Sequence, residues 1–575
     1  MRSADVARIL DEMGTLLELK GENPFRCRAY HNAADAVRGL GDDLPDRIAS
    51  GKLAEVPGIG ETIQRKIIQL VTTGSLPSYE QLRAELPPGL VALLRVPGLG
   101  PKKIKALHEA LQIESLADLR RAGESGKIAG LKGFGAKTQR KILEGLAFVE
   151  STGGRILQST AWRLVAPIVE AVRSCPGVVR VEVCGSLRRR LETIGDLDVL
   201  FAAEDPVPVL DRFVGLPEVA AVLSHGETKA SVRLAGGVQC DLRGVRPEQF
   251  PFALHYFTGS KAHNIALRKR AIARGLRLNE YGLEGQEGPI PCSSEEELFQ
   301  ALGLHPIPPE LREDRGEIER AEAGPIPPLI ERKDLTGTFH CHTDWSDGGN
   351  TLLEMAEAAR ARGLSYLGIA DHSRSAGYAG GLSIDRVRRQ GEEIDALNDQ
   401  LGPDFRLFKG IECDILADGT LDYPDEVLAG FDYVVASVHS NFGQPIGVMT
   451  ARIVRAVRHP MVTMLGHPTG RLLLRRDGYA VDLEAVIAEA AEAGTLIEIN
   501  ANPHRLDLDA EHSRRARDRG VRLVINPDAH AVGGLDDLDY GVGVARRAGL
   551  GPSDVFNTAP LSRIAAELRP GGAGA

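Results

Sequence analysis

The sequence predicts a multidomain protein: an α-helical N-terminal region, an α+β region in the middle, and a parallel (β/α)7-type barrel at the C-terminus. Three observations predict it. A glycine-rich motif occurs three times before residue 140, a glycine loop at 185–186 leads to an acidic strand ending near residue 200, and seven short apolar strands alternate with helices over 336–575. A chain of 575 residues is also too long for one hydrophobic core.

The helical prediction rests on the repeated motif, V-P-G-I-G at 56–60, V-P-G-L-G at 96–100 and L-K-G-F-G at 131–135. Each copy precedes a Lys/Arg-rich amphipathic helix, as in a helix-hairpin-helix. Glycines allow a tight turn whose N–H groups can hold a DNA phosphate, directly or through a cation, without reading the base sequence. Residues 97–141 carry ten basic and four acidic side chains, which suits that role. The candidate DNA-binding glycines are Gly58, Gly60, Gly98, Gly100, Gly133 and Gly135.

The α+β region is organised around residues 183–200, V-C-G-S-L-R-R-R-L-E-T-I-G-D-L-D-V-L. In a strand, residues two apart share a face, so Asp196 and Asp198 stand side by side. Paired carboxylates suit divalent cations, and two metals about 3.5–4 Å apart are a usual device for phosphoryl transfer. Asp241, on a later apolar strand, offers a third carboxylate. The simpler alternative is a surface aspartate pair beside a basic loop.

G-S-L-R-R, then G-D-L-D, then a lone aspartate resembles the palm of the X-family DNA polymerases, the polymerase beta kind. The resemblance implies a nucleotidyltransferase palm with a small C-terminal subdomain. In it, the three aspartates hold Mg²⁺ or Mn²⁺ and are catalytic, while dNTPs and gapped or primer-template DNA are the partners. The residues implied to hold the triphosphate are Ser186, Arg189 and Gly195, with Arg155 a weaker candidate.

H-Y-F-T-G-S-K-A-H-N at 255–264 resembles the segment with which this family holds the incoming nucleotide. By that resemblance Tyr256, Phe257 and Gly259 pack beside the sugar, and Asn264 reaches the minor-groove edge of the base. Taken alone, the segment reads as an aromatic-capped turn, but its position after the palm favours the nucleotide role.

Three basic residues complete this comparison. Arg268 falls where the family contacts the template, whereas Lys261 stands where the polymerase beta pattern has an aspartate. Lys66 falls where the resemblance places the Schiff-base lysine of a deoxyribose-phosphate lyase. A phosphate-binding lysine on a helix face is the alternative for Lys66.

The barrel prediction rests on strands read at 337–342, 365–371, 406–412, 432–438, 461–466, 495–500 and 521–527. The reactive face of a parallel barrel is the carboxyl end of its strands. Ligand-type residues gather at or just past those ends: His340, His342, Asp347, His372, Glu412, His439, His467, Asp528 and His530. Nitrogen and oxygen donors without thiolate suit Zn²⁺, Mn²⁺ or Fe²⁺. Cys341 and Cys413 alternate away from the ligand face, so we expect them to be packing residues.

This constellation resembles the PHP (polymerase and histidinol phosphatase) domain, a trinuclear phosphoesterase barrel. The resemblance implies three ions, Zn²⁺ and/or Mn²⁺. One would be held by His340, His342, Glu412 and Asp528, a second by Glu412, His439 and His467, and a third by Asp347, His372 and His530. Arg374 and Arg471 are candidate phosphate contacts, or parts of a solvated face.

Composition sets further expectations. The net charge is −10, but residues 1–335 carry 45 basic and 45 acidic residues, so the whole deficit lies in the barrel. The seven cysteines lack metal-type spacing and are expected to be reduced. No apolar run approaches the ~20 residues of a membrane span, so we expect a cytoplasmic protein. We also expect it to be monomeric.

The expected divisions are two DNA-binding helical parts at 1–80 and 81–154, the palm at 155–245 and a nucleotide-selection subdomain at 246–310. A linker at 311–335 and the barrel at 336–575 follow.

Both resemblances together match the bacterial X-family polymerase architecture. They imply gap-filling DNA synthesis in repair, joined to a metal-dependent 3′-5′ exonuclease. The alternatives are a nucleotidyltransferase fused to a phosphatase or 3′-end-cleaning phosphoesterase, and a DNA-binding scaffold with decayed sites.

Overall fold

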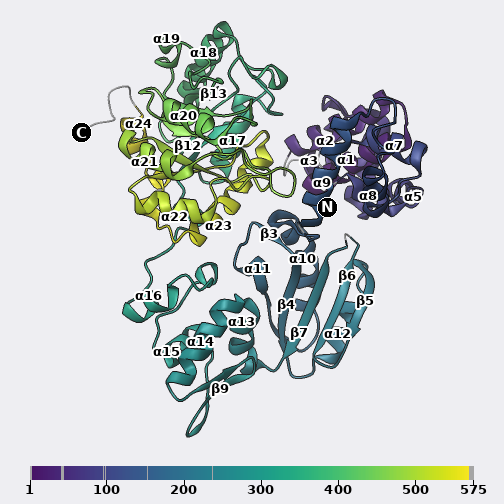
Figure 1. The fold of residues 1–575 in the computed structure, drawn as a ribbon, viewed down its shortest axis with the longest axis vertical. Coiled ribbons are helices and arrows are strands. Elements are labelled where there is room, and N and C mark those ends of the chain that lie inside the picture. The colour runs from purple at the N-terminus through teal and green to yellow at the C-terminus, as the bar shows by residue number, and fades with distance from the viewer. Residues whose placement is uncertain are drawn as a thin grey trace.

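The computed structural model describes residues 3–40, 44–94, 96, 99–151, 153–235 and 237–568. Gly98, one of the six expected DNA-contacting glycines, lies outside them. Figure 1 shows a helical lobe formed by the N-terminal region, a sheet-containing region beneath it, and a C-terminal body in which helices surround parallel strands.

The N-terminal lobe is all helical. Its apolar side chains form one continuous core, from Val6 on the first helix to Val149 on the last, which spans the two helical parts expected at 1–80 and 81–154. The helices are α1 Ser3–Lys20, α2 Pro24–Leu40, α3 Leu44–Ala49, η2 Lys52–Glu55, α4 Glu61–Thr73, α5 Pro77–Ala84, α6 Pro88–Leu93, α7 Pro101–Leu111, α8 Leu116–Glu124 and α9 Ala136–Ser151.

The three glycine motifs each lead into a helix, as predicted: α4, α7 and α9 begin directly after them. Gly58 and Gly133, at matching positions in the first and third copies, both have φ +87°, a conformation that residues with a Cβ rarely adopt. Gly60 and Gly100 cap α4 and α7 with extended backbones.

The palm is a five-stranded sheet in the order β2-β4-β7-β6-β5, in which only β4 and β7 run parallel. Apolar residues of α10 and α12 form one core with it, and α13 contributes to a second, smaller cluster. The elements are β1 Ile156–Leu157, α10 Gln158–Arg173, β2 Val178–Val183, α11 Gly185–Arg188, β3 Thr193–Ile194, β4 Asp196–Ala203, α12 Val207–Val214, β5 Val219–His225, β6 Lys229–Leu234 and β7 Gln239–Val245.

The following subdomain has its own core, and the segment expected to be a linker adds to it. Within 311–335, α16 buries Ile318 and Ala321 in this core, and the buried Arg312 pairs with Glu295 at 2.5 Å. The linker prediction missed this packing because buried charge pairs produce no periodic pattern of hydrophobic residues in the sequence. The elements are η3 Pro247–Gln249, α13 Phe250–Thr258, α14 Lys261–Ala273, β8 Arg277–Asn279, β9 Gly282–Gly285, β10 Gly288–Ile290, α15 Glu295–Ala301, η4 Pro309–Leu311 and α16 Glu317–Ala323.

All seven strands predicted for the C-terminal region are present, and they form one parallel sheet in sequence order. The strands are β11 Gly337–Cys341, β12 Tyr366–Ile369, β13 Arg406–Asp414, β14 Tyr433–Ser437, β15 Met464–Leu465, β16 Leu496–Asn500 and β17 Leu523–Asn526. The helices are η5 Arg332–Asp334, α17 Leu352–Ala361, η6 Gly377–Ala379, α18 Ile384–Leu401, α19 Asp425–Leu428, α20 Ile446–Val457, α21 Leu483–Ala493, α22 Ala510–Asp518, η7 Val532–Asp537, α23 Leu538–Arg547, η8 Pro552–Asp554, η9 Phe556–Thr558 and α24 Leu561–Glu567.

The sheet closes between its first and last strands, which makes it a barrel. Phe339 donates its backbone N–H to the side chain of Asn526 at 3.1 Å, and Cys341 bridges to Ala529. Aromatic rings of Phe339, Tyr366 and Tyr433 belong to a separate cluster of buried residues contributed by β11 to β17 and α24. The ligand-type residues therefore stand above a packed core at the carboxyl ends of the strands.

All seven cysteines lie in the described chain and are buried free thiols. Cys341 and Cys413 each sit in an apolar cluster, which agrees with the packing role expected for them. None of the helices that the structure describes is both long and apolar enough to cross a membrane.

Candidate active sites

The first candidate site lies at one end of the two parallel palm strands. Asp198 on β4 stands directly opposite Asp241 on β7, and Asp196 precedes Asp198 by two residues. Burial, with the nearby charges of Asp196 and Asp241, raises the pKa of Asp198 to about 7. Such mutual repulsion favours a bound cation, because positive charge between the carboxylates would relieve it.

The loop before β4 comes into close contact with Asp198. A Cβ on Gly185 would lie 2.1 Å from Asp198 Oδ2, and Gly185 also has φ +60°, so this position requires glycine. The next residue, Ser186, has a buried hydroxyl with no hydrogen-bond partner in the described chain. An unsatisfied buried hydroxyl is costly, which suits a group awaiting a ligand oxygen.

Asp241 is held by its own neighbours. Lys229 Nζ lies 2.7 Å from one carboxylate oxygen, and Gln239 Nε2 donates to the other at 2.9 Å. Neither contact was foreseen from the sequence, although Lys229 and Asp241 lie on paired strands, β6 and β7.

The arginines near this site are more engaged than the sequence suggested. Arg189 pairs with Glu313 at 3.0 Å and donates to the Thr258 carbonyl at 2.5 Å, and Arg188 pairs with Glu295 at 2.6 Å. Both side chains thereby tie the palm loop to the following subdomain.

The weaker candidate Arg155 donates to the hydroxyl and carbonyl of Thr193 and lies close to Gly195. It therefore braces the strand that leads to Asp196.

The segment 255–264 lies against the palm. Asn264 Nδ2 donates to the Tyr256 carbonyl at 2.7 Å, and a Cβ on Gly259 would lie 3.1 Å from Arg189 Nη1. The ring of Phe257 packs edge-on to that of Tyr256 and lies beneath the Arg243 guanidinium. Arg268 is exposed on α14.

Lys66 lies on α4, one turn past the first hairpin. Its Nζ donates to Ser78 Oγ at 3.0 Å and sits 5.4 Å from the centre of the Tyr30 ring. These contacts suit either reading of Lys66, as a nucleophile or as a phosphate contact.

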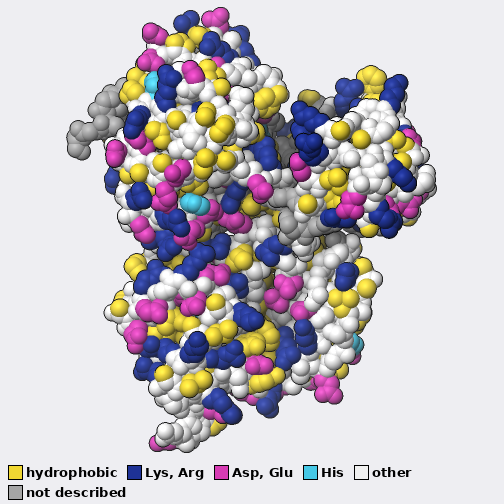
Figure 2. Space-filling view, in the orientation of Figure 1, with side chains coloured by type: hydrophobic (Ala, Val, Ile, Leu, Met, Phe, Trp, Pro, Cys, Tyr) yellow, Lys and Arg dark blue, Asp and Glu magenta, His cyan; other side chains and the backbone are white. Residues whose placement is uncertain are grey.

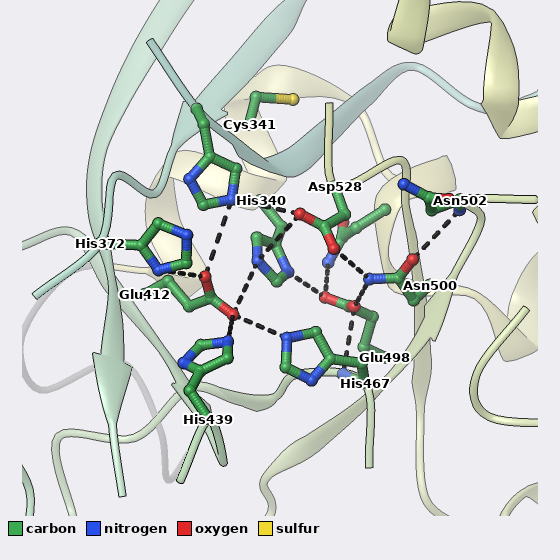
Figure 3. A network of polar contacts seen from close by, with 12 residues as sticks. His340, Cys341, His372, Glu412, His439, His467, Glu498, Asn500, Asn502 and Asp528 are labelled. Carbon is green, nitrogen blue, oxygen red and sulfur yellow. Dashed lines mark hydrogen bonds and ion pairs between the residues drawn. The ribbon is translucent and has the colours of Figure 1, made fainter. Parts of the chain in front are cut away.

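The second candidate site gathers all nine ligand-type residues predicted in the barrel. Figure 3 shows the Glu412 carboxylate at the centre, with histidines from separate strand ends pointing toward it. The nitrogens of His467, His372, His340 and His439 lie 2.8, 3.0, 3.2 and 3.2 Å from its oxygens. Burial alone would raise the pKa of Glu412, but His439, His340 and His372 lower it well below the usual range.

The remaining predicted ligands extend this cluster. Asp528 lies 3.2 Å from His342 Nε2, and Asp347 lies 3.4 Å from His530 Nε2 and 3.6 Å from His372 Nε2. The groups whose donor atoms converge are His342, Asp347, His372 and His530; His340, His342 and Glu412; His340, His467 and Asp528; and His372, Glu412 and His439. These four groups differ from the three expected ligand sets: His342 joins Asp347, His372 and His530, and His372 takes the place of His467 beside Glu412 and His439. His467 groups instead with His340 and Asp528.

The donors fit metal ions. His340 Nε2, His342 Nε2 and His372 Nδ1 are buried and lie 3.0–3.2 Å from carboxylate oxygens, yet none makes a hydrogen bond in the described chain. Buried imidazole nitrogens and carboxylate oxygens that converge on a shared point are the arrangement that a cation satisfies.

Three of these residues have an unusual backbone. His340, His467 and Asp528 have φ values of 56°, 25° and 52°, which L-residues rarely adopt. At His340 the pairing between β11 and β12 also shifts register. Such strain persists where the surroundings impose it, often at functional sites.

Two carboxylates behind the ligands were missed by the sequence analysis. Glu498 lies 2.5 Å from His340 Nδ1, and Asp414 lies 2.5 Å from His439 Nδ1. Such partners fix the orientation of a metal-binding imidazole. The signal was available, since each is a carboxylate within an apolar strand, and Asp414 follows Glu412 by two residues.

The two candidate phosphate-binding arginines have other partners. Arg374 contacts the side chain and carbonyl of Asp422. Arg471 is largely buried and pairs with Glu192 of the palm. Because of this pair, Arg471 is better described as part of the junction between barrel and palm. No sequence pattern reveals the contact, since the two residues lie 279 positions apart.

Comparison with known proteins identifies the family. The chain is 41% identical to the DNA polymerase/3′-5′ exonuclease PolX of Bacillus subtilis (strain 168) over 575 residues, which is 99% of this chain and 100% of that one. The chain belongs to the PolX family. Family profiles match a helix-hairpin-helix domain at 1–76, a SAM-like helix-hairpin-helix tandem at 90–147, a DNA polymerase beta thumb at 253–313 and a PHP domain at 338–502.

This PolX-family chain also resembles smaller proteins over part of its length. Over 236 residues it is 28% identical to a probable phosphatase of Thermoanaerobacter sp. (strain X514), covering 38% of this chain and 89% of that protein. A probable phosphatase of Clostridium acetobutylicum is 28% identical over 217 residues, covering 35% and 82%.

Proposed function

We propose that this chain is a template-directed DNA polymerase that fills short gaps in DNA repair, and that its barrel is a metal-dependent 3′-5′ exonuclease. The observation that carries the proposal is the presence of both constellations in one chain that a PolX polymerase/exonuclease matches along 99% of its length. We expect the protein to be cytoplasmic and monomeric.

In the polymerase, Asp196, Asp198 and Asp241 would hold Mg²⁺ or Mn²⁺. When bound, these cations supply the charge that stabilises the triphosphate and activates the primer hydroxyl. Ser186 offers its unpaired hydroxyl to a phosphate oxygen. Gly185 lets that loop approach Asp198, which brings the triphosphate to the carboxylates.

Arg189, Gly195, Tyr256, Phe257 and Asn264 would shape the nucleotide pocket and Arg268 would face the template, as the X-family resemblance implies. Arg189 lies against Gly259, so the palm loop and the 255–264 segment would respond to the nucleotide together. The hairpin glycines would hold DNA phosphates, and Lys66 would serve as a phosphate contact or as the Schiff-base lysine of a lyase.

In the barrel, Zn²⁺ and/or Mn²⁺ would be held by the nine histidines and carboxylates. When bound, such cations make a water molecule acidic enough to attack a phosphodiester and stabilise its negative oxygens. Glu412 would serve two ions, because both of its oxygens face histidine nitrogens.

The test is a labelled primer on a gapped template with Mn²⁺, with and without dNTPs. Extension with dNTPs and shortening without them are expected from the wild type. Asp198→Ala should lose only extension, and Glu412→Ala only shortening, so each variant is the control for the other. Loss of both activities in both variants would refute two separate sites.

A phosphatase or 3′-end-cleaning activity is the second candidate for the barrel, favoured by its 28% identity to probable phosphatases. Wild type that hydrolyses a chromogenic phosphomonoester but never shortens DNA would establish it in place of the exonuclease.

A further inference from the structure

Tyr378 is an exposed aromatic residue beside the histidine cluster. Its side chain is 74% exposed, yet its ring centre lies 6.3 Å from that of His372. Of the large apolar side chains that are exposed in the described chain, the others with an aromatic ring are Phe25, Trp162 and Tyr281, which lie outside the barrel. Contact with water does not favour an exposed aromatic ring at this position.

The loop that carries Tyr378 is firmly held. Ala376 and Ala379 on either side of it are buried, and Leu382 donates its N–H to the His372 carbonyl at 2.9 Å. A Cβ on Gly381 would lie 2.1 Å from the Ser373 carbonyl oxygen, so the backbone packs closely against itself. The ring is therefore presented to solvent from a fixed support.

The opposite side of this loop is anchored too. Arg386 Nη1 donates to the Gly380 carbonyl at 2.8 Å, and the same guanidinium contacts the Trp345 carbonyl in the loop that bears Asp347. A ligand that rests on Tyr378 would thus be placed relative to the cluster rather than merely near it.

A flat, preorganised ring at the edge of a phosphodiester-cleaving site matches one group in the expected substrate, the nucleobase. Base-aromatic stacking is strong and indifferent to sequence, because every base has a π-face. We propose that Tyr378 stacks on the 3′-terminal base of single-stranded DNA and so positions the adjacent phosphodiester at the cluster. This proposal rests on the exonuclease function and makes Tyr378 a positioning residue that selects nucleic acid.

The test compares two 5′-labelled oligonucleotides that differ only at the 3′ terminus, one ending in thymidine and one in an abasic tetrahydrofuran nucleotide. Removal of the terminal nucleotide is measured as kcat/KM with Mn²⁺ for the full-length wild type, Tyr378→Ala and Tyr378→Phe. Deleting the base or the ring should each cost about tenfold, as expected for one lost stack. Removing both the base and the ring should cost no more than removing one of them. Tyr378→Ala should therefore have nearly the same kcat/KM for the two substrates.

Tyr378→Phe is the matched control, because it keeps the ring and should retain the preference for thymidine. Bound metal and primer extension should be unchanged in Tyr378→Ala. Equal losses on both substrates, or none, would overturn the stacking role while leaving the exonuclease in place. Failure of the wild type to shorten either substrate would instead refute the exonuclease and this inference with it.

Discussion

Arg471 of the barrel and Glu192 of the palm form an ion pair of 2.9 Å between two side chains that are less than one-fifth and about one-fifth exposed. Arg471 also donates to the carbonyls of Arg505 and Leu506, and Arg505 contacts Asp528 of the histidine cluster at 3.2 Å. Figure 2 shows Lys, Arg, Asp and Glu side chains gathered on the visible face of the molecule where the barrel meets the region beneath it. The histidine cluster of the barrel is thus joined to Glu192 of the palm by a short series of polar contacts.

We predict that Arg471→Met lowers the thermal stability of the barrel, because it leaves the Glu192 carboxylate and two carbonyls without their donor. The loss should be about 2 kcal/mol, typical of hydrogen bonds to a charged group. Thermal unfolding of the full-length chain followed by calorimetry measures it. Arg388→Met is the matched control, since Arg388 is 72% exposed and its nearest acidic partner is 3.7 Å away. Equal effects of the two substitutions would mean that the junction pair contributes nothing.

The raised pKa of Asp198 predicts that the stability of the metal-free protein depends on pH. Its pKa of about 7 in the folded chain, against 3.8 for an ordinary aspartate, means that the metal-free folded state keeps a proton that the unfolded state releases. Stability without metal should therefore fall as pH rises from about 4 to about 7. Asp198→Asn should remove that fall and stabilise the palm by about 2 kcal/mol at pH 8, since one pKa unit corresponds to about 1.4 kcal/mol and the carboxyl is partly exposed. Urea unfolding in EDTA at pH 5 and pH 8 tests this, and an unchanged pH slope would contradict it.

The sequence was sufficient where chemistry repeats in a pattern. Seven strands of the barrel and the gathering of nine ligand-type residues near their ends were predictable, because strand ends converge in a parallel barrel. It was insufficient where a charged side chain pairs with a residue that is distant in the sequence. Arg189 and Arg471 were expected near phosphates, but each pairs with a distant glutamate, and only the folded chain brings such partners together.

Gly185→Ala should abolish primer extension. The new methyl group would lie 2.1 Å from the Asp198 carboxylate at a backbone angle of φ +60°, so both the loop and the carboxylate must move. We expect a loss of at least about 100-fold, because small displacements of reacting groups are costly. Shortening of DNA should be unchanged. Gly177→Ala is the matched control, since Gly177 also has a positive φ, +81°, but faces open space. Comparable losses in both variants would point to backbone strain alone.

The hairpin glycines allow a test of phosphate contact that leaves the backbone unstrained. Gly60 and Gly100 have extended backbones, and a Cβ on either would meet nothing within 4 Å. Valine at both positions should therefore leave the fold intact but hold a DNA phosphate away from the helix N-termini. We expect weaker binding to all DNA sequences alike and a shallower salt dependence, because fewer phosphates are contacted. Fluorescence anisotropy at several salt concentrations measures it, and a sequence-selective loss would contradict phosphate contact.

Glu498→Gln should weaken metal binding in the barrel although Glu498 is not itself an expected ligand. Its carboxylate is fully buried and lies 2.5 Å from His340 Nδ1, while Asn500 and Asn526 donate to it at 2.7 and 3.1 Å. An amide of the same shape cannot accept from all these donors, since one of its two polar atoms is itself a donor. His340 would then lose the charged acceptor that orients its other nitrogen toward Glu412, and such changes typically cost 10- to 100-fold in metal affinity. Titration of the metal-free protein with Mn²⁺ measures the loss, with Asp395→Asn on the barrel surface as the control for lost charge. Primer extension should be unaffected, because Asp196, Asp198 and Asp241 lie in the separate palm, and unchanged Mn²⁺ affinity would refute the orienting role of Glu498.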